Sequence, residues 1–266
     1  MSDDETEEML RRLREDTSLR SSLSSSDCGL TDGNVPVVPF VEPHYGTAFR
    51  GFGGERKIVS AAPYRSILVA EYRALLDADP LVERFAAYPH VLTYSRLTKD
   101  GRWERKTYTP DVALRTKGGE GRRSKTVVVE VRADELRAEK AWREREPFIR
   151  HAYAVDHGVE FFVFGESEIR REPRLSNCKR LNAHRWRGRS DDEARRRLED
   201  VLPHVLPKAT DRMPIVDLVE RADLPPPNGA NRAFDAVANL ILEGWLFIDH
   251  RVPLSGRSLV FRSPLQ

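Results

Sequence analysis

Apolar and polar residues alternate along the chain with two periods, one typical of helices and one typical of strands. Four large apolar residues between Leu68 and Leu76 recur at helical spacing and predict a helix over residues 63–78. Runs rich in β-branched and aromatic residues then predict strands at 91–94, 103–108, 112–115, 126–131 and 161–164. A long charged helix, with Pro147 as a potential point of interruption, is expected over 134–157. Together these elements indicate an α/β core.

Residues 191–266 carry a second pattern, of helices followed by two short apolar runs. The helices are expected at 191–206, 213–221 and 230–243, and the runs at 245–248 and 259–261. Ser190 suits the N-cap of the first helix, Pro207 ends it, and Gly244 ends the third. Three helices and a β-hairpin are typical of a winged-helix domain. Because the third helix offers few polar side chains, docking onto a partner is at least as well supported as base recognition.

The N-terminal part of the chain shows neither pattern over a useful length. Residues 1–34 are acidic and then serine-rich, and only Met9, Leu10 and Leu13 form a short amphipathic stripe. We expect a mobile tail that orders on a partner. Residues 35–62 contain several prolines and glycines and are expected to form an irregular arm.

Composition excludes several classes of protein. No apolar run approaches the roughly 20 residues of a membrane-spanning helix, and the acidic N-terminus lacks the form of a signal peptide, so the protein is expected to be cytoplasmic. Cys28 and Cys178 match no zinc-ligand spacing and are expected to be reduced thiols. The net charge is only +2, but 32% of the residues are charged and cations gather between residues 170 and 189.

Two carboxylates stand at the ends of predicted strands. Asp111 opens the strand at 112–115, and on the run 126–131 the strand period places Glu130 on one face with Val128 and, beyond the run, Arg132. If the two strands are neighbours, Asp111 and Glu130 approach closely enough to hold Mg²⁺, which prefers carboxylate oxygens and activates water. Pro-Asp is also a common turn opening and Glu-x-Arg is often solvated charge, so both interpretations stay open.

Glu71 adds a third carboxylate on the first predicted helix. It stands three residues after Leu68 and four before Leu75, on or beside the inward face. A buried carboxylate needs a cation or a metal. A structural ion pair, or exposure at the edge of the core, explains Glu71 about as well as a functional role.

The order of these pieces resembles the nuclease domain of TnsA, the endonuclease subunit of heteromeric cut-and-paste transposases. The resemblance covers residues 66–180 and rests on the order and spacing of Glu71, Asp79-Pro80-Leu81-Val82, Tyr88-Pro89, Tyr108-Thr109-Pro110-Asp111-Val112, Val129-Glu130-Val131-Arg132 and the strand at 161–164. It implies a restriction-endonuclease-like mixed sheet flanked by helices over 63–180. The cations predict a basic linker over 181–190, and the small winged-helix domain expected over 191–266 also fits the resemblance.

The resemblance also implies the site and the partners. Glu71, Asp111 and Glu130 would be the metal ligands, with the Val131 carbonyl as an additional one, for Mg²⁺ or Mn²⁺ as its substitute. Arg132 would take the place of the catalytic lysine. The protein would cut the 5′-side strand at transposon ends, together with a DDE-type transposase subunit and an AAA+ ATPase regulator, in a complex where it could form a homo-oligomer.

Two departures from the family pattern bear on activity. Tyr88-Pro89 stands where the family commonly has Gln-Pro, and Arg132 cannot accept a proton because arginine stays charged. Lys125 falls on the opposite strand face from Glu130, and Lys140 would reach the site only if its helix lies across it. A DNA-binding scaffold that has lost cleavage is therefore one alternative, and a stand-alone restriction-type or junction-resolving nuclease is another.

Basic side chains near the core are candidates for contacts with DNA phosphates. They are Arg122, Arg123, Lys179, Arg180, Arg185, Arg187 and Arg189. The alternative is a solvated connector, which is common in charged proteins.

Overall fold

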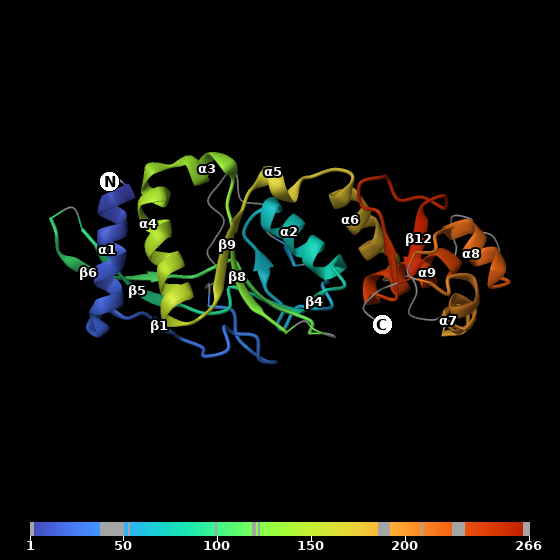
Figure 1. Cartoon of the computed structure of the whole chain (residues 1–266), viewed down its shortest axis with the longest axis horizontal. Coiled ribbons are helices and arrows are strands. Elements are labelled where there is room, and N and C mark those ends of the chain that lie inside the picture. Colours follow the sequence, from blue (N-terminus) through green and yellow to red (C-terminus); the bar gives the residue numbers. More distant parts are fainter. Residues whose placement is uncertain are drawn as a thin grey trace. The chain divides into compact units, whose positions relative to one another are not determined.

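The structure is a computed structural model of the whole chain, and it describes residues 3–37, 51–52, 54–98, 100–118, 121, 123–185, 192–208, 210–224 and 232–262. The chain divides into two compact units (Figure 1). Unit 1 comprises Met1–Tyr72, Val82–Gly118 and Arg123–Ile169, and unit 2 comprises Arg73–Leu81, Gly119–Arg122 and Arg170–Gln266. Helix α2 (Ile67–Ala78) contributes residues to both.

Unit 1 is built on a four-stranded mixed sheet with the strand order β4-β7-β8-β9. The strands are β4 (Val82–Ala87), β7 (Val112–Thr116), β8 (Thr126–Val131) and β9 (Glu160–Phe164). Strands β4, β7 and β8 are antiparallel, whereas β9 runs parallel to β8. The pairing of Val112 with Val129 confirms that the two strands bearing the predicted carboxylates are neighbours.

The two faces of this sheet pack against different elements. Ala113, Val128 and Phe161 form one row across the strands and belong to the core that includes Trp142 of α4 (Lys140–His151). On the opposite face, Phe164 stacks on Tyr72 of α2 with the ring centroids 5.5 Å apart. Helices α2 and α4 thus flank β8 and β9 from two sides (Figure 1), and the prediction of an α/β core is confirmed.

Further elements complete unit 1. They are α1 (Asp3–Glu15), η1 (Thr17–Leu19), β1 (Ser22–Leu23), β2 (Gly51–Phe52), β3 (Pro63–Tyr64), β5 (Leu92–Leu97), β6 (Trp103–Tyr108), α3 (Asp134–Ala138), η2 (Ala152–Asp156) and α5 (Glu166–Ile169). Strands β1, β5 and β6 form a second sheet, and β2 pairs with β3. The long helix expected over 134–157 divides at Glu139, whose backbone is extended, and Pro147 lies inside α4.

The N-terminal segment differs from the expected mobile tail. Residues 3–15 form α1, and Met9 and Leu13 are buried in the same core as Trp142. Cys28 and Leu30 are buried in that core as well. The short apolar stripe suffices because other parts of unit 1 supply the apolar surface that it covers, and Glu8 pairs with Arg11 and Arg12 on the outer face.

His90 is a buried titratable group in unit 1, and it gives the unit a pH-dependent stability. Its Nε2 lies 2.8 Å from the hydroxyl of Tyr153, and burial lowers the pKa of His90 to about 4. The unfolded chain therefore binds this proton more readily, and stability is lost as pH falls from about 6.5 towards 4. We expect the urea unfolding free energy of His90→Gln to fall less than that of the wild type between pH 7 and pH 5, by roughly 1–2 kcal/mol. An equal fall in both proteins would contradict this assignment.

Unit 2 consists of helices and a three-stranded antiparallel sheet. The helices are α6 (Arg174–Arg185), α7 (Asp192–Val205), α8 (Ile215–Arg221) and α9 (Arg232–Glu243). The strands are β10 (Met213–Pro214), β11 (Leu246–Ile248) and β12 (Leu259–Arg262), in the order β10-β12-β11. Gly244 ends α9 as predicted: its φ is +86°, and the next residue, Trp245, donates its N–H to the Leu240 carbonyl at 2.9 Å.

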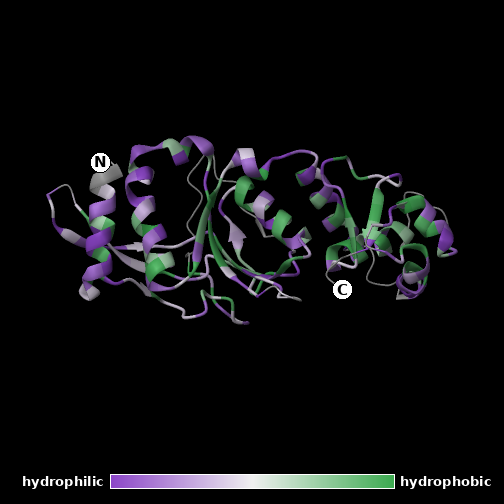
Figure 2. Ribbon diagram, viewed as in Figure 1, coloured by the Kyte–Doolittle hydropathy of each residue, from purple (hydrophilic) through white to green (hydrophobic). Residues whose placement is uncertain are grey.

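The distribution of apolar residues follows this architecture. Figure 2 shows hydrophobic colour gathered on the central strands and on α9, and largely hydrophilic colour on α1 and on α4. None of the helices in the described ranges is long and apolar enough to cross a membrane. Cys28 and Cys178 are both free and buried.

Candidate active site

Asp111 is fully buried directly before β7. Its Oδ2 accepts the N–H of Val131 at 2.8 Å and a hydrogen bond from Nη2 of Arg65 at 2.9 Å. Its Oδ1 lies 2.8 Å from the same nitrogen but receives no hydrogen bond. The backbone of Asp111 is also held, because its carbonyl accepts the N–H of Tyr88 at 2.9 Å. Asp111 is therefore a firmly held carboxylate, one of whose oxygens accepts no hydrogen bond.

Glu130 is the second buried carboxylate, one residue before the end of β8. Its Oε2 accepts the hydroxyl of Tyr108 at 2.7 Å, and its Oε1 accepts Nη2 of Arg132 at 3.2 Å. Burial and the charge of Glu130 raise the pKa of Tyr108 well above its usual value, so this hydroxyl stays protonated and donates. Glu130 shares the sheet face of Val128, as the strand period predicts.

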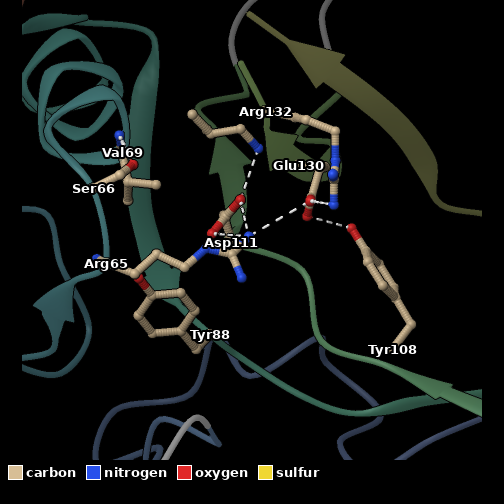
Figure 3. Close-up of polar contacts among 9 residues, drawn as sticks. Arg65, Ser66, Val69, Tyr88, Tyr108, Asp111, Glu130 and Arg132 are labelled. Atoms are coloured by element: carbon tan, nitrogen blue, oxygen red, sulfur yellow. Dashed lines mark hydrogen bonds and ion pairs between the residues drawn. The ribbon is translucent and has the colours of Figure 1, made fainter. Parts of the chain in front are cut away.

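Arg65 joins the two carboxylates. Its Nη2 lies 2.8 Å from Asp111 Oδ1 and 3.5 Å from Glu130 Oε1 (Figure 3), although 46% of the Arg65 side chain is exposed. Its backbone N–H donates to the Tyr88 hydroxyl at 3.0 Å, and its guanidinium lies 5.9 Å from the Tyr88 ring centre. Sequence reasoning missed Arg65, which stands outside every recognised motif in the turn between β3 and α2.

Tyr88 positions both sides of this site. It is buried with a φ of +47°, a conformation that non-glycine residues seldom adopt. The hydrogen bonds to Arg65 and Asp111 hold it there. Tyr88 is one of the two departures from the family pattern. Its ring lies beside the Arg65 guanidinium and its hydroxyl accepts the Arg65 N–H, whereas the glutamine common in the family has no aromatic ring.

The ionisation of Asp111 is strongly perturbed by its surroundings. Burial and, after it, the charge of Glu130 raise the pKa of Asp111 to about 7, while Arg65 and the Val131 N–H act in the opposite direction. Two carboxylates are thus held together in the protein interior, where the ionisation of both is costly without a cation. Groups perturbed in this way are concentrated at functional sites.

Arg132 lies on the predicted face but is held firmly by its surroundings. Its guanidinium carbon lies 4.2 Å from the ring centre of Trp142, and only 17% of its side chain is exposed. It also contacts Glu130, as described above. Arg132 is therefore a fixed positive charge beside Glu130, stabilised by a cation–π contact.

The predicted three-carboxylate set is not assembled. Within the described ranges, no group of three or more His, Cys, Asp or Glu side chains is arranged to hold a metal ion. Glu71 is partly buried on α2 and does not complete a triad with Asp111 and Glu130. The guanidinium of Arg65 is the group that faces both carboxylates instead.

The pair nevertheless fits a divalent cation in its chemistry. Carboxylate oxygens are the ligands that Mg²⁺ and Mn²⁺ prefer. Asp111 Oδ1 is buried and accepts no hydrogen bond, although Nη2 of Arg65 lies 2.8 Å from it as an ion pair. Neither alternative lysine is recorded in contact with these carboxylates: Lys125 pairs with Glu160 at 3.0 Å, and Lys140 is exposed 3.8 Å from Glu144.

The predicted DNA-binding cations divide into two groups. Lys179 and Arg123 are exposed, and exposed Arg180 donates to the Leu254 carbonyl at 2.8 Å. Arg185 is buried, and its guanidinium binds the carboxylate and the carbonyl of Asp77. The expectation that Arg185 tracks phosphate is therefore wrong, because its charge is already paired in the interior.

The remaining predicted cations, Arg122, Arg187 and Arg189, lie outside the described residues. The basic linker expected at 181–190 is helical in its described part, since α6 continues to Arg185.

Comparison of the chain with known proteins finds no family model and no curated protein that matches it.

Proposed function

We propose that the protein is a metal-dependent DNA endonuclease in which Asp111 and Glu130 hold Mg²⁺. The observation that carries the proposal is the pair of buried carboxylates at neighbouring strand ends, one of them with an oxygen that accepts no hydrogen bond. A protein has little reason to bury like charges together unless a cation joins them. When bound, Mg²⁺ would activate a water and neutralise charge on the phosphodiester.

The architecture supports a restriction-endonuclease-like interpretation of unit 1. A helix precedes a mixed sheet, the carboxylates stand where β7 begins and β8 ends, and α2 and α4 cover opposite faces. After α6, unit 2 continues with the element order α7, β10, α8, α9, β11, β12, with the three strands in one sheet. That order supports a winged-helix domain.

The side chains of this site divide the work between them. Asp111 and Glu130 bind the cation, and Tyr108 and the Val131 N–H orient their oxygens. Arg132 supplies a fixed positive charge but no proton acceptor. Exposed cations such as Arg123 and Lys179 would bind DNA phosphates. The role in transposition, with a transposase and an ATPase as partners, rests on the sequence resemblance.

A second candidate is a DNA-binding scaffold that no longer cleaves. Arg65 between the carboxylates favours it, because a guanidinium can balance their charge without any metal.

The experiment that separates the two is nicking of supercoiled plasmid in Mn²⁺ by the wild type and by Arg132→Lys. We expect the wild type to nick, with loss of nicking on chelation. Lysine would add a compact ammonium but lose most of the stacking on Trp142, so Arg132→Lys is expected to change the rate by less than about tenfold.

Silence of the wild type together with cleavage by Arg132→Lys would favour the scaffold. Silence of both proteins, alone and with a transposase partner, would contradict the nuclease.

A further inference from the structure

The guanidinium of Arg65 occupies the position that a bridging cation would take. It is 2.8 Å from Asp111 Oδ1 and 3.5 Å from Glu130 Oε1, so one nitrogen faces both carboxylates (Figure 3). We propose that Arg65 is the internal counter-cation of this site and that it competes directly with a divalent metal for the two carboxylates. The inference rests on the proposed metal site, and it adds a residue that regulates entry of the metal.

Competition between Arg65 and a metal is feasible because the two carboxylates are buried while Arg65 is partly exposed. The carboxylate side chains of Asp111 and Glu130 are 0% and 2% exposed, so they cannot turn to solvent when a partner leaves. The Arg65 side chain is 46% exposed. It can therefore move outwards without opening the core, and its charge is readily solvated at the surface.

Arg65 is also tethered so that it stays near the site after displacement. Its backbone N–H is bound to the Tyr88 hydroxyl, and Tyr88 in turn binds the backbone of Asp111. Only the side chain has to change rotamer.

Arg132 behaves differently and serves as an internal comparison. Its side chain is only 17% exposed, and the ring of Trp142 covers its guanidinium. Of the two carboxylates, Arg132 forms an ion pair with Glu130, at 3.2 Å. A metal would therefore displace Arg65 and leave Arg132 in place.

The two cations must exclude each other because the same oxygens serve both. Asp111 Oδ1 and Glu130 Oε1 face Arg65, and a metal held by Asp111 and Glu130 would draw on these same carboxylates. A guanidinium nitrogen cannot remain within contact distance of those oxygens while a metal of equal sign lies between them. The apparent metal affinity is then the intrinsic affinity reduced by the cost of displacing Arg65.

The test is binding of Mn²⁺, measured by calorimetry at pH 8, to the wild type, Arg65→Gln and Arg65→Lys. We expect Arg65→Gln to bind Mn²⁺ about tenfold more tightly than the wild type, with Arg65→Lys closer to the wild type. Arg137→Gln is the matched control, because Arg137 also bridges two carboxylates, Asp134 and Glu168, but these carboxylates are 44% and 38% exposed rather than buried. The control is expected to bind as the wild type does.

Thermal unfolding gives a second readout that does not depend on activity. Without metal, Arg65→Gln should melt below the wild type, because two buried carboxylates lose a cation. Saturating Mn²⁺ should raise its Tm by more than it raises that of the wild type. Asp111→Asn combined with Arg65→Gln should abolish the binding, which would assign the cation to this pair.

The outcomes separate this inference from the proposed function. Equal Mn²⁺ affinities for the wild type and Arg65→Gln, both lost with Asp111→Asn, would overturn the competition and leave the metal site standing. No Mn²⁺ binding by any of these proteins would overturn both.

Discussion

Substitution of Asp111 by asparagine is expected to abolish metal-dependent cleavage while leaving the protein at least as stable as the wild type at pH 8. The carboxylate is the only one of the pair whose oxygen lacks a hydrogen-bond donor, and asparagine cannot supply a negative charge to a metal. The metal stabilises the transition state by several kcal/mol, so its loss is expected to reduce the nicking rate by about 10³-fold or more.

The stability of Asp111→Asn is expected to rise although its cleavage activity falls. Burial and the charge of Glu130 raise the pKa of Asp111 to about 7, so in the folded protein the ionised form is disfavoured relative to the unfolded chain. Stability is therefore lost as pH rises from about 4 to 7, and the loss is complete at pH 8. Asparagine removes this cost, although Arg65 loses one partner. Opposite changes in activity and stability would show that cleavage is not lost through unfolding.

The measurements are the plasmid nicking rate in Mn²⁺ and the urea unfolding free energy at pH 5 and pH 8. Asp32→Asn is a matched control, because Asp32 is an exposed carboxylate paired with Arg84. It should change neither quantity by much. Nicking by Asp111→Asn at the wild-type rate would remove this site from consideration.

The strands that carry the site were predictable because their signal is local. The run Thr126–Val131 alternates so that Val128 and Glu130 share a face, and the structure confirms both the strand and its pairing with β7. The strand Trp103–Tyr108 is confirmed as well. Strand period and β-branched composition suffice for such elements.

Arg65 could not be predicted, because its role depends on tertiary packing. It lies 46 residues before Asp111 and reaches it only because Tyr88, on a different segment, holds its backbone. No spacing rule links these residues. The N-terminal helix escaped for a related reason: Met9 and Leu13 cover surface that only the folded core provides.

Glu71 shows how far a local inference reaches. The helix was predicted and is confirmed, with the residue at the edge of its buried face. Whether its carboxylate meets two others depends on the rotation and position of the helix, which helical spacing does not specify. In the structure the turn before that helix supplies a cation to the pair instead.

Replacement of Arg185 by alanine is expected to destabilise unit 2 by about 3–5 kcal/mol, the usual cost of breaking a buried ion pair. The side chains of Arg185 and Asp77 are only 4% and 6% exposed. The guanidinium binds the Asp77 carboxylate and also donates to the Asp77 carbonyl at 2.7 Å. Its removal leaves a carboxylate buried without that cation, in a position that water cannot readily reach.

Urea unfolding, combined with hydrogen exchange of α6, would measure the effect within unit 2. Arg180→Ala is the matched control on the same helix, because Arg180 is exposed, and it should cost about 1 kcal/mol or less. Arg185→Met combined with Asp77→Leu should recover much of the loss, since an apolar pair replaces a buried ion pair at little cost. If Arg185→Ala instead weakened DNA binding at unchanged stability, Arg185 would be a phosphate contact after all. We expect stability to fall and DNA binding by the folded protein to stay unchanged, because Arg185 is buried and its charge is neutralised by Asp77.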